Sequence, residues 1–167
     1  MNAKKYLFTK IFIHFILASA IGMLFMSPGF AAETKDMGGW ELNSPYNRLY
    51  NPAEMDRIKG KVEKIIEIVP MPGMSPGVAL LIRESKSETT MVHLCPTWYI
   101  DHKNTGLKKG DTVKIRGVWV EIDDTYVFMA SKIKKGDYFQ LKVRLTKDGK
   151  PFWTMSPEEE AREKANQ

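Results

Sequence analysis

Hydrophobic and polar side chains alternate along most of the chain after residue 56. In residues 58–69 the apolar side chains fall mainly at even positions and the charged ones at odd positions, which is the period of a half-buried β-strand. Lys64 interrupts this alternation. Further strands are predicted by apolar or alternating runs over residues 78–83, 89–95, 112–122, 125–133 and 138–145. The pattern therefore predicts a mainly β protein.

The order and shape of these strands reduce the number of folds that fit the sequence. The strand over residues 112–122 changes phase at Gly117, and a glycine at such a point is typical of a β-bulge. Residues 97–104 are expected to form a short helix capped by Thr97. Three strands, a short helix and two more strands are the order of an OB-fold. We expect an all-β fold with one short helix, as an OB-fold-like five-stranded barrel with an extra C-terminal strand. A plain β-sandwich is the alternative.

Before and after this domain, the sequence no longer shows the alternation of β-strands. Residues 1–31 contain three lysines, then an apolar stretch, then small residues, as a signal peptide does. An uncleaved anchor is the alternative, although the apolar stretch is shorter than the ~20 residues of a membrane-spanning helix. We expect an irregular arm over residues 32–56, the OB-like domain over 57–155 and a charged tail over 156–167. The protein is therefore expected in the periplasm or secreted, or else anchored to the inner membrane.

The charge argues against a polyanion as the main partner. The chain carries a formal charge of +5, and three of these charges are lysines in residues 1–31, where there is no acidic residue. The remainder is only weakly basic. Lysine, arginine and aromatic residues are frequent over residues 114–135, as in OB-folds that bind nucleic acid. Because phosphate binding scales with positive charge, and because export removes the protein from the cytoplasm, we do not expect nucleic acid to be the main partner.

The strand over residues 89–95 carries the best candidate for metal chemistry. Strand alternation places Met91, His93 and Cys95 on one face, and the loop before the second strand adds Met74. Thioether, imidazole and thiolate groups suit copper or zinc. The alternative is ordinary packing, because methionine fills gaps in cores and a lone cysteine is commonly buried.

A second candidate surface comes from the fold rather than from metal ligands. OB-folds commonly bind through the second and third strands and the loop between the first two. Here that surface offers four ligand-binding candidates, Met71, Met74, Trp98 and Tyr99. The sequence contains no glycine-rich phosphate loop, HExxH motif or nucleophile motif, so we expect no catalysis.

Several segments also resemble a known family, the MamS/MamX magnetosome proteins, which are small exported bacterial proteins. The segments are GMSPGVALLI (73–82), MVHLCPTWYID (91–101), LKKGDTVKIRGVWV (107–120) and the run from residue 129 to residue 153. The resemblance implies an exported OB-like domain with a link to metal or redox handling in the envelope. Cys95 replaces an expected glycine, and no CxxCH motif is present, so covalent haem binding does not carry over.

Together these observations predict an exported, non-catalytic OB-like binding or assembly module of the bacterial envelope. Its partner is expected to be a protein or a small ligand, and it would touch the membrane only through an uncleaved N-terminal segment. The alternatives are a periplasmic protein that handles copper, iron or zinc or assists redox chemistry, and a nucleic-acid-binding OB-fold protein.

Overall fold

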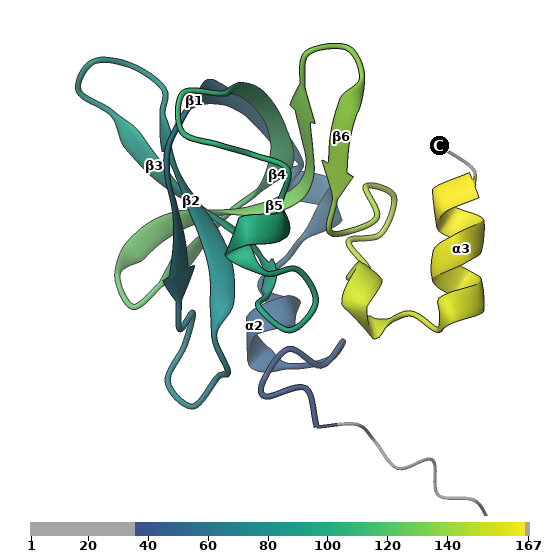
Figure 1. Ribbon diagram of the computed structural model, residues 1–167. Coiled ribbons are helices and arrows are strands. Elements are labelled where there is room, and N and C mark those ends of the chain that lie inside the picture. Colours follow the sequence, from purple (N-terminus) through teal and green to yellow (C-terminus); the bar gives the residue numbers. More distant parts are fainter. Residues whose placement is uncertain (1–35, 166–167) are drawn as a thin grey trace, which may run out of the picture. The chain divides into compact units, whose positions relative to one another are not determined.

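Six strands form one sheet in the computed structural model, which describes residues 36–165 (Figure 1). The strands are β1 (Asp56–Ile68), β2 (Gly77–Arg83), β3 (Thr89–Pro96), β4 (Thr112–Ile122), β5 (Thr125–Lys135) and β6 (Phe139–Lys142). Neighbours pair antiparallel in the order β3-β2-β1-β4-β5-β6, and β3 also pairs in parallel with β5. The first five strands therefore close in a ring with the strand order of an OB-fold. The predicted fold class, including the extra C-terminal strand, is confirmed.

The signal peptide or anchor expected over residues 1–31 lies outside the described residues, as does the beginning of the expected arm. None of the helices within residues 36–165 has the length and apolar character needed to cross a membrane.

Three register shifts interrupt the strand pairing, and two of them fall where the sequence pattern changes phase. Gly117 lies at a shift between β4 and β5, as the phase change predicts. A side chain there would collide with the carbonyl oxygen of Met129 and the ring of Phe128, so glycine alone fits this crossing. A second shift, between Val62 and Lys64 of β1, changes the pairing with β2. This bulge explains why Lys64 interrupts the alternation of β1.

The helix expected after β3 is shorter than predicted. Residues 97–101 form a turn, and only η2 (His102–Asn104), a 3₁₀ helix, follows. The Thr97 hydroxyl donates a hydrogen bond to the Pro76 carbonyl at 3.1 Å, so it caps no helix. Asp101 caps η2 instead, because its carboxylate accepts from the backbone N–H of Lys103 at 2.8 Å. The other helical segments are α2 (Pro45–Arg48), η1 (Pro52–Glu54), η3 (Phe152–Thr154) and α3 (Pro157–Ala165).

The segment before β1 is held down by buried aromatic side chains. Trp40 and Tyr46 are almost fully buried and meet edge to face, with ring centroids 5.0 Å apart. The Trp40 indole N–H donates to the Ser75 carbonyl in the loop between β1 and β2, at 2.9 Å. The Trp153 indole N–H donates to the Trp40 carbonyl at 2.9 Å. The segment therefore ties the β1–β2 loop to the C-terminal part of the domain.

The end of the predicted sixth strand departs from its alternation. The pattern places Arg144 on the polar face, but its side chain is only 1% exposed. The chain leaves β6 after Lys142, and the guanidinium lies over the rings of Tyr50 and Trp153, at 5.0 and 4.8 Å from their centroids. One guanidinium nitrogen donates to the Asn47 side-chain oxygen at 2.7 Å. The strand prediction was wrong beyond Lys142, because Arg144 gains aromatic faces as partners there.

The crossing at Gly117 gives a first prediction. Gly117→Ala should lower the free energy of unfolding by roughly 1–3 kcal/mol, because the added methyl group overpacks the contact between β4 and β5. The control Glu121→Ala changes an exposed position of the same strand and should stay within ~0.5 kcal/mol of the unsubstituted protein. Urea denaturation followed by circular dichroism measures both. Equal stability of the two variants would contradict the assigned role of Gly117.

Candidate anion-binding face

A row of three isoleucines crosses the sheet and decides where the neighbouring side chains point. Ile58 of β1 pairs with Ile115 of β4, and Ile115 pairs in turn with Ile133 of β5. All three are buried in the core. Because successive residues of a strand point to opposite faces, the residues on either side of each isoleucine point outward. At all six of these positions the residue is lysine or arginine.

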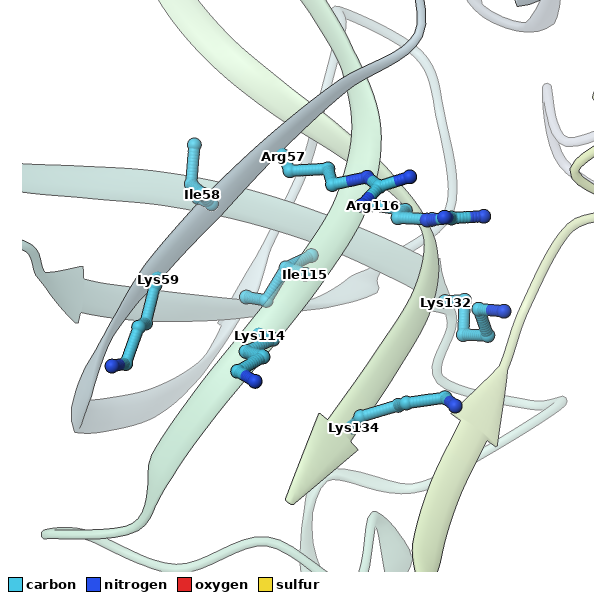
Figure 2. Close-up of a pocket in the computed structure, with 8 residues that line it drawn as sticks. All are labelled: Arg57, Ile58, Lys59, Lys114, Ile115, Arg116, Lys132 and Lys134. Atoms are coloured by element: carbon cyan, nitrogen blue, oxygen red, sulfur yellow. The ribbon is translucent and has the colours of Figure 1, made fainter. Parts of the chain in front are cut away.

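These six cations form two rows on the outside of the sheet, which we call the basic face: Arg57, Arg116 and Lys132 in one row and Lys59, Lys114 and Lys134 in the other. Residues directly opposite each other in an antiparallel pair have Cβ atoms about 4.5–5.5 Å apart. Lys142 of β6 continues the first row, since it pairs with Lys132. Figure 2 shows the ends of Arg57, Arg116, Lys132 and Lys134 directed to the same side of the strands.

The basic face lines a hollow of about 330 Å³. The other residues of the described range that line it are Ile58 and Ile115, so no acidic side chain from residues 36–165 lines the hollow. Among residues 36–165, none of the six cations belongs to an ion pair within 4.0 Å. The positive charges therefore face solvent and one another.

Burial and neighbouring like charges both act on Lys132. Burial of its ammonium group lowers the pKa of Lys132, and the charges of Arg116 and Lys134 lower this pKa further. Like charges directly opposite one another destabilise a sheet. An anion bound in the hollow would offset that repulsion. Arginine forks and lysine ammonium groups are the side chains that bind phosphate, sulfate and carboxylate groups.

Sequence analysis missed the basic face because it judged the whole domain by its small net charge. The acidic residues are numerous, but among residues 36–165 none of them lines this hollow. A local signal was present: the triplets RIK (57–59), KIR (114–116) and KIK (132–134) each place two cations around a core isoleucine. Only the cross-strand register shows that the three triplets lie side by side.

The predicted metal ligands on β3 do not all share one face. His93 pairs with Ala79 of β2, whereas Cys95 pairs with Val78. Ala79 and Val78 are neighbours and point to opposite faces, so their partners do as well. The expectation that Met91, His93 and Cys95 share a face was wrong for Cys95, because a register shift between β2 and β3 resets the alternation.

Two of these residues are sealed inside the domain. His93 stacks on Tyr46 with an interplanar angle of 24°, and its Nδ1 lies 3.2 Å from the Tyr46 hydroxyl. Burial lowers the pKa of His93 to about 4, and the positive charge of Arg144 contributes to this shift. Cys95 is fully buried, and burial raises the pKa of its thiol to about 12. At neutral pH the imidazole is therefore uncharged and the thiol protonated.

Among residues 36–165, no group of three or more His, Cys, Asp and Glu side chains could hold a metal ion. Met74 and Met91 are half-buried and pack against the core. A soft metal at this place would have to displace the proton of the Cys95 thiol. The copper or zinc site expected from Met74, Met91, His93 and Cys95 stays a prediction.

The expected ligand-binding residues lie around the β1–β2 loop and the turn after β3: Met71, Met74, Trp98 and Tyr99. The N-terminal segment covers part of this loop, since the Ser75 N–H donates to the Gly38 carbonyl at 2.8 Å. The Tyr99 hydroxyl donates to a carboxylate oxygen of Glu160 in α3 at 2.9 Å, and Trp98 is 44% exposed. None of the four lines the hollow of the basic face. Their role in binding stays a prediction.

Burial of His93 predicts a pH dependence. The imidazole titrates near 6.5 when unfolded and near 4 when folded, so protonation favours the unfolded state as the pH falls between these values. Between pH 7.5 and 4.5 the protein should lose about 2–3 kcal/mol of unfolding free energy beyond the loss seen in His93→Gln. His102→Gln, a surface control, should behave like the unsubstituted protein. Urea titrations at both pH values measure this, and identical losses in all three proteins would contradict it.

Comparison with protein-family models matches residues 54–139. The matched segment begins just before β1, ends at the first residue of β6 and includes all six cations of the basic face. No curated protein matches the chain. The match spans more than half of the chain and confirms the resemblance noted in the sequence: the chain belongs to the MamS/MamX magnetosome protein family.

Proposed function

We propose that this magnetosome-family protein is an exported, non-catalytic binding module that holds an anionic partner from the cell envelope on its basic face. One observation carries the proposal: three strands place six cations in two adjoining rows, and in the part of the chain that the structure describes no acidic side chain lines their hollow. Cations so placed repel one another. A bound anion would offset this repulsion, and this is why we assign the arrangement a binding role.

The chemistry of the hollow supports binding rather than catalysis. Its lining residues are lysine, arginine and isoleucine. Arginine stays protonated in proteins, and its planar fork donates hydrogen bonds to two oxygens of one phosphate or carboxylate group. Lysine adds a point charge on a flexible stem. Such a set orients an anion, but it provides neither a nucleophile with an adjacent base nor a carboxylate pair for acid and base steps.

The proposal of export has separate support in the sequence. Residues 1–31 have the lysines, apolar stretch and small residues of a signal peptide. Whether cleaved or retained as an anchor, such a segment brings the domain outside the cytoplasm. The partner would then be an anionic protein, small ligand or surface of that compartment.

Charge reversal tests the proposal most simply. Binding of inorganic tripolyphosphate, measured by isothermal calorimetry on the full chain, should be at least tenfold weaker for Lys114→Glu/Lys134→Glu. Two lost charge-assisted contacts, each about 1.5–3 kcal/mol, account for this loss. Binding should also weaken between 50 and 200 mM salt, because the contacts are exposed and screened.

The matched control reverses the same amount of charge elsewhere. Lys64 and Lys103 are exposed and do not line the hollow, so Lys64→Glu/Lys103→Glu should keep nearly all of the affinity. If both double variants lose affinity equally, net charge alone explains binding and the basic face is not the site. If the unsubstituted protein binds no tripolyphosphate at 50 mM salt, the proposal fails.

A further inference from the structure

The turn between β5 and β6 presents a fully exposed aromatic side chain beside the basic face. Tyr138 is 99% exposed, more than any other large hydrophobic residue that the structure leaves exposed in residues 36–165. It follows Gly136, whose φ of +58° lets the chain reverse at the end of β5. The β5–β6 hairpin extends from the ring in Figure 1. Nothing within residues 36–165 covers the ring of Tyr138.

The turn borders the basic face directly. A second hollow, of about 460 Å³, is lined by Gly136 and Asp137 of the turn together with Lys59, Lys114 and Lys134. Thr112 also lines it, and Asp137 is the one acidic residue that the described part of the chain contributes to it. The turn that carries Tyr138 is therefore continuous with one row of cations.

This combination favours a surface over a single small anion. The cations of the basic face come from three strands and continue to Lys142 on β6, so they cover an extended area of sheet. Basic residues are attracted to anionic lipid headgroups within about a Debye length of the bilayer. Tyrosine is enriched at membrane interfaces, where its ring enters the apolar boundary and its hydroxyl stays hydrated.

The same residues argue against single-stranded nucleic acid. Proteins that bind it combine positive charge with aromatic platforms on which bases stack. Within residues 36–165, only lysine, arginine and isoleucine side chains line the hollow of the basic face, and none is aromatic. Trp119, on the same strand as Lys114, packs edge-on against Phe128 and donates its indole N–H to Asp56 at 3.2 Å. The edge of the Trp119 ring and its N–H group therefore already make contacts within the domain.

We propose that the basic face docks on the surface of a bilayer containing anionic phospholipid, with Tyr138 inserted at the interface beside it. The lipid phosphates would occupy the positions of the anions in the proposed function, on which this inference rests. The outer face of β1, β4 and β5 would then contact the membrane, whether residues 1–31 are cleaved or retained.

The test compares vesicles of phosphatidylcholine with vesicles that also contain phosphatidylglycerol. Flotation of the full chain should show binding that requires phosphatidylglycerol, weakens with salt and falls at least tenfold in Lys114→Glu/Lys134→Glu. Tyr138→Ser should weaken binding several-fold. Tyr126→Ser removes another exposed tyrosine, 67% exposed at the opposite end of β5, and should leave binding unchanged.

A second readout removes any contribution of an uncleaved N-terminal segment. Tyr138→Trp and Tyr126→Trp place an indole at the two ends of β5, and brominated phosphatidylglycerol quenches only indoles at the bilayer. Quenching should increase, relative to the unsubstituted protein, for Tyr138→Trp alone. Equal quenching of both variants, or none at Tyr138→Trp, overturns the inference.

The remaining outcomes separate this inference from the proposed function. If tripolyphosphate binds through the basic face but anionic vesicles do not, membrane docking is wrong and anion binding stands. If single-stranded DNA binds more tightly than the vesicles and Tyr138→Ser has no effect on either, the partner is nucleic acid and the inference is overturned. If neither tripolyphosphate nor vesicles bind, both proposals fail.

Discussion

The register that pairs Ile58, Ile115 and Ile133 determines both the core and the outer surface of this domain. Each buried isoleucine contributes about 1.5–3 kcal/mol of hydrophobic stabilisation, and together the three fix the pairing of β1, β4 and β5. A shift by one residue would bury the flanking lysines and arginines and expose the isoleucines. The same hydrophobic energy therefore holds six like charges side by side, which no interaction among those charges would do.

The closure of the ring leaves the outer face of these strands open while other surfaces are covered. The N-terminal segment packs on the β1–β2 loop through Trp40, and Tyr46 covers His93 on β3. That region is the common binding surface of OB-folds. The basic face lies elsewhere, on the outside of β1, β4 and β5, and Lys142 of β6 extends it. Binding activity is therefore best sought on β1, β4 and β5.

The strands, the bulge at Gly117 and the fold class could be predicted from the sequence, whereas local features that depend on contacts with residues distant in the chain could not. The bulge at Gly117 follows from a phase change in one strand. The two residues between the predicted strands 112–122 and 125–133 form a turn, in which Asp123 and Asp124 both have positive φ. The burial of Arg144 and the separation of His93 from Cys95 depend on distant partners. The basic face also depends on distant partners, because only the pairing of β1, β4 and β5 places the three triplets side by side.

Mapping the bound anion residue by residue tests the central claim most directly. Backbone amide resonances recorded by nuclear magnetic resonance during a tripolyphosphate titration would report which strands sense the ligand. The account predicts shifts concentrated at residues 57–59, 114–116 and 132–134, reversed by added salt. Shifts confined to β3 and the loop over residues 70–76, with none on β1, β4 and β5, would contradict it.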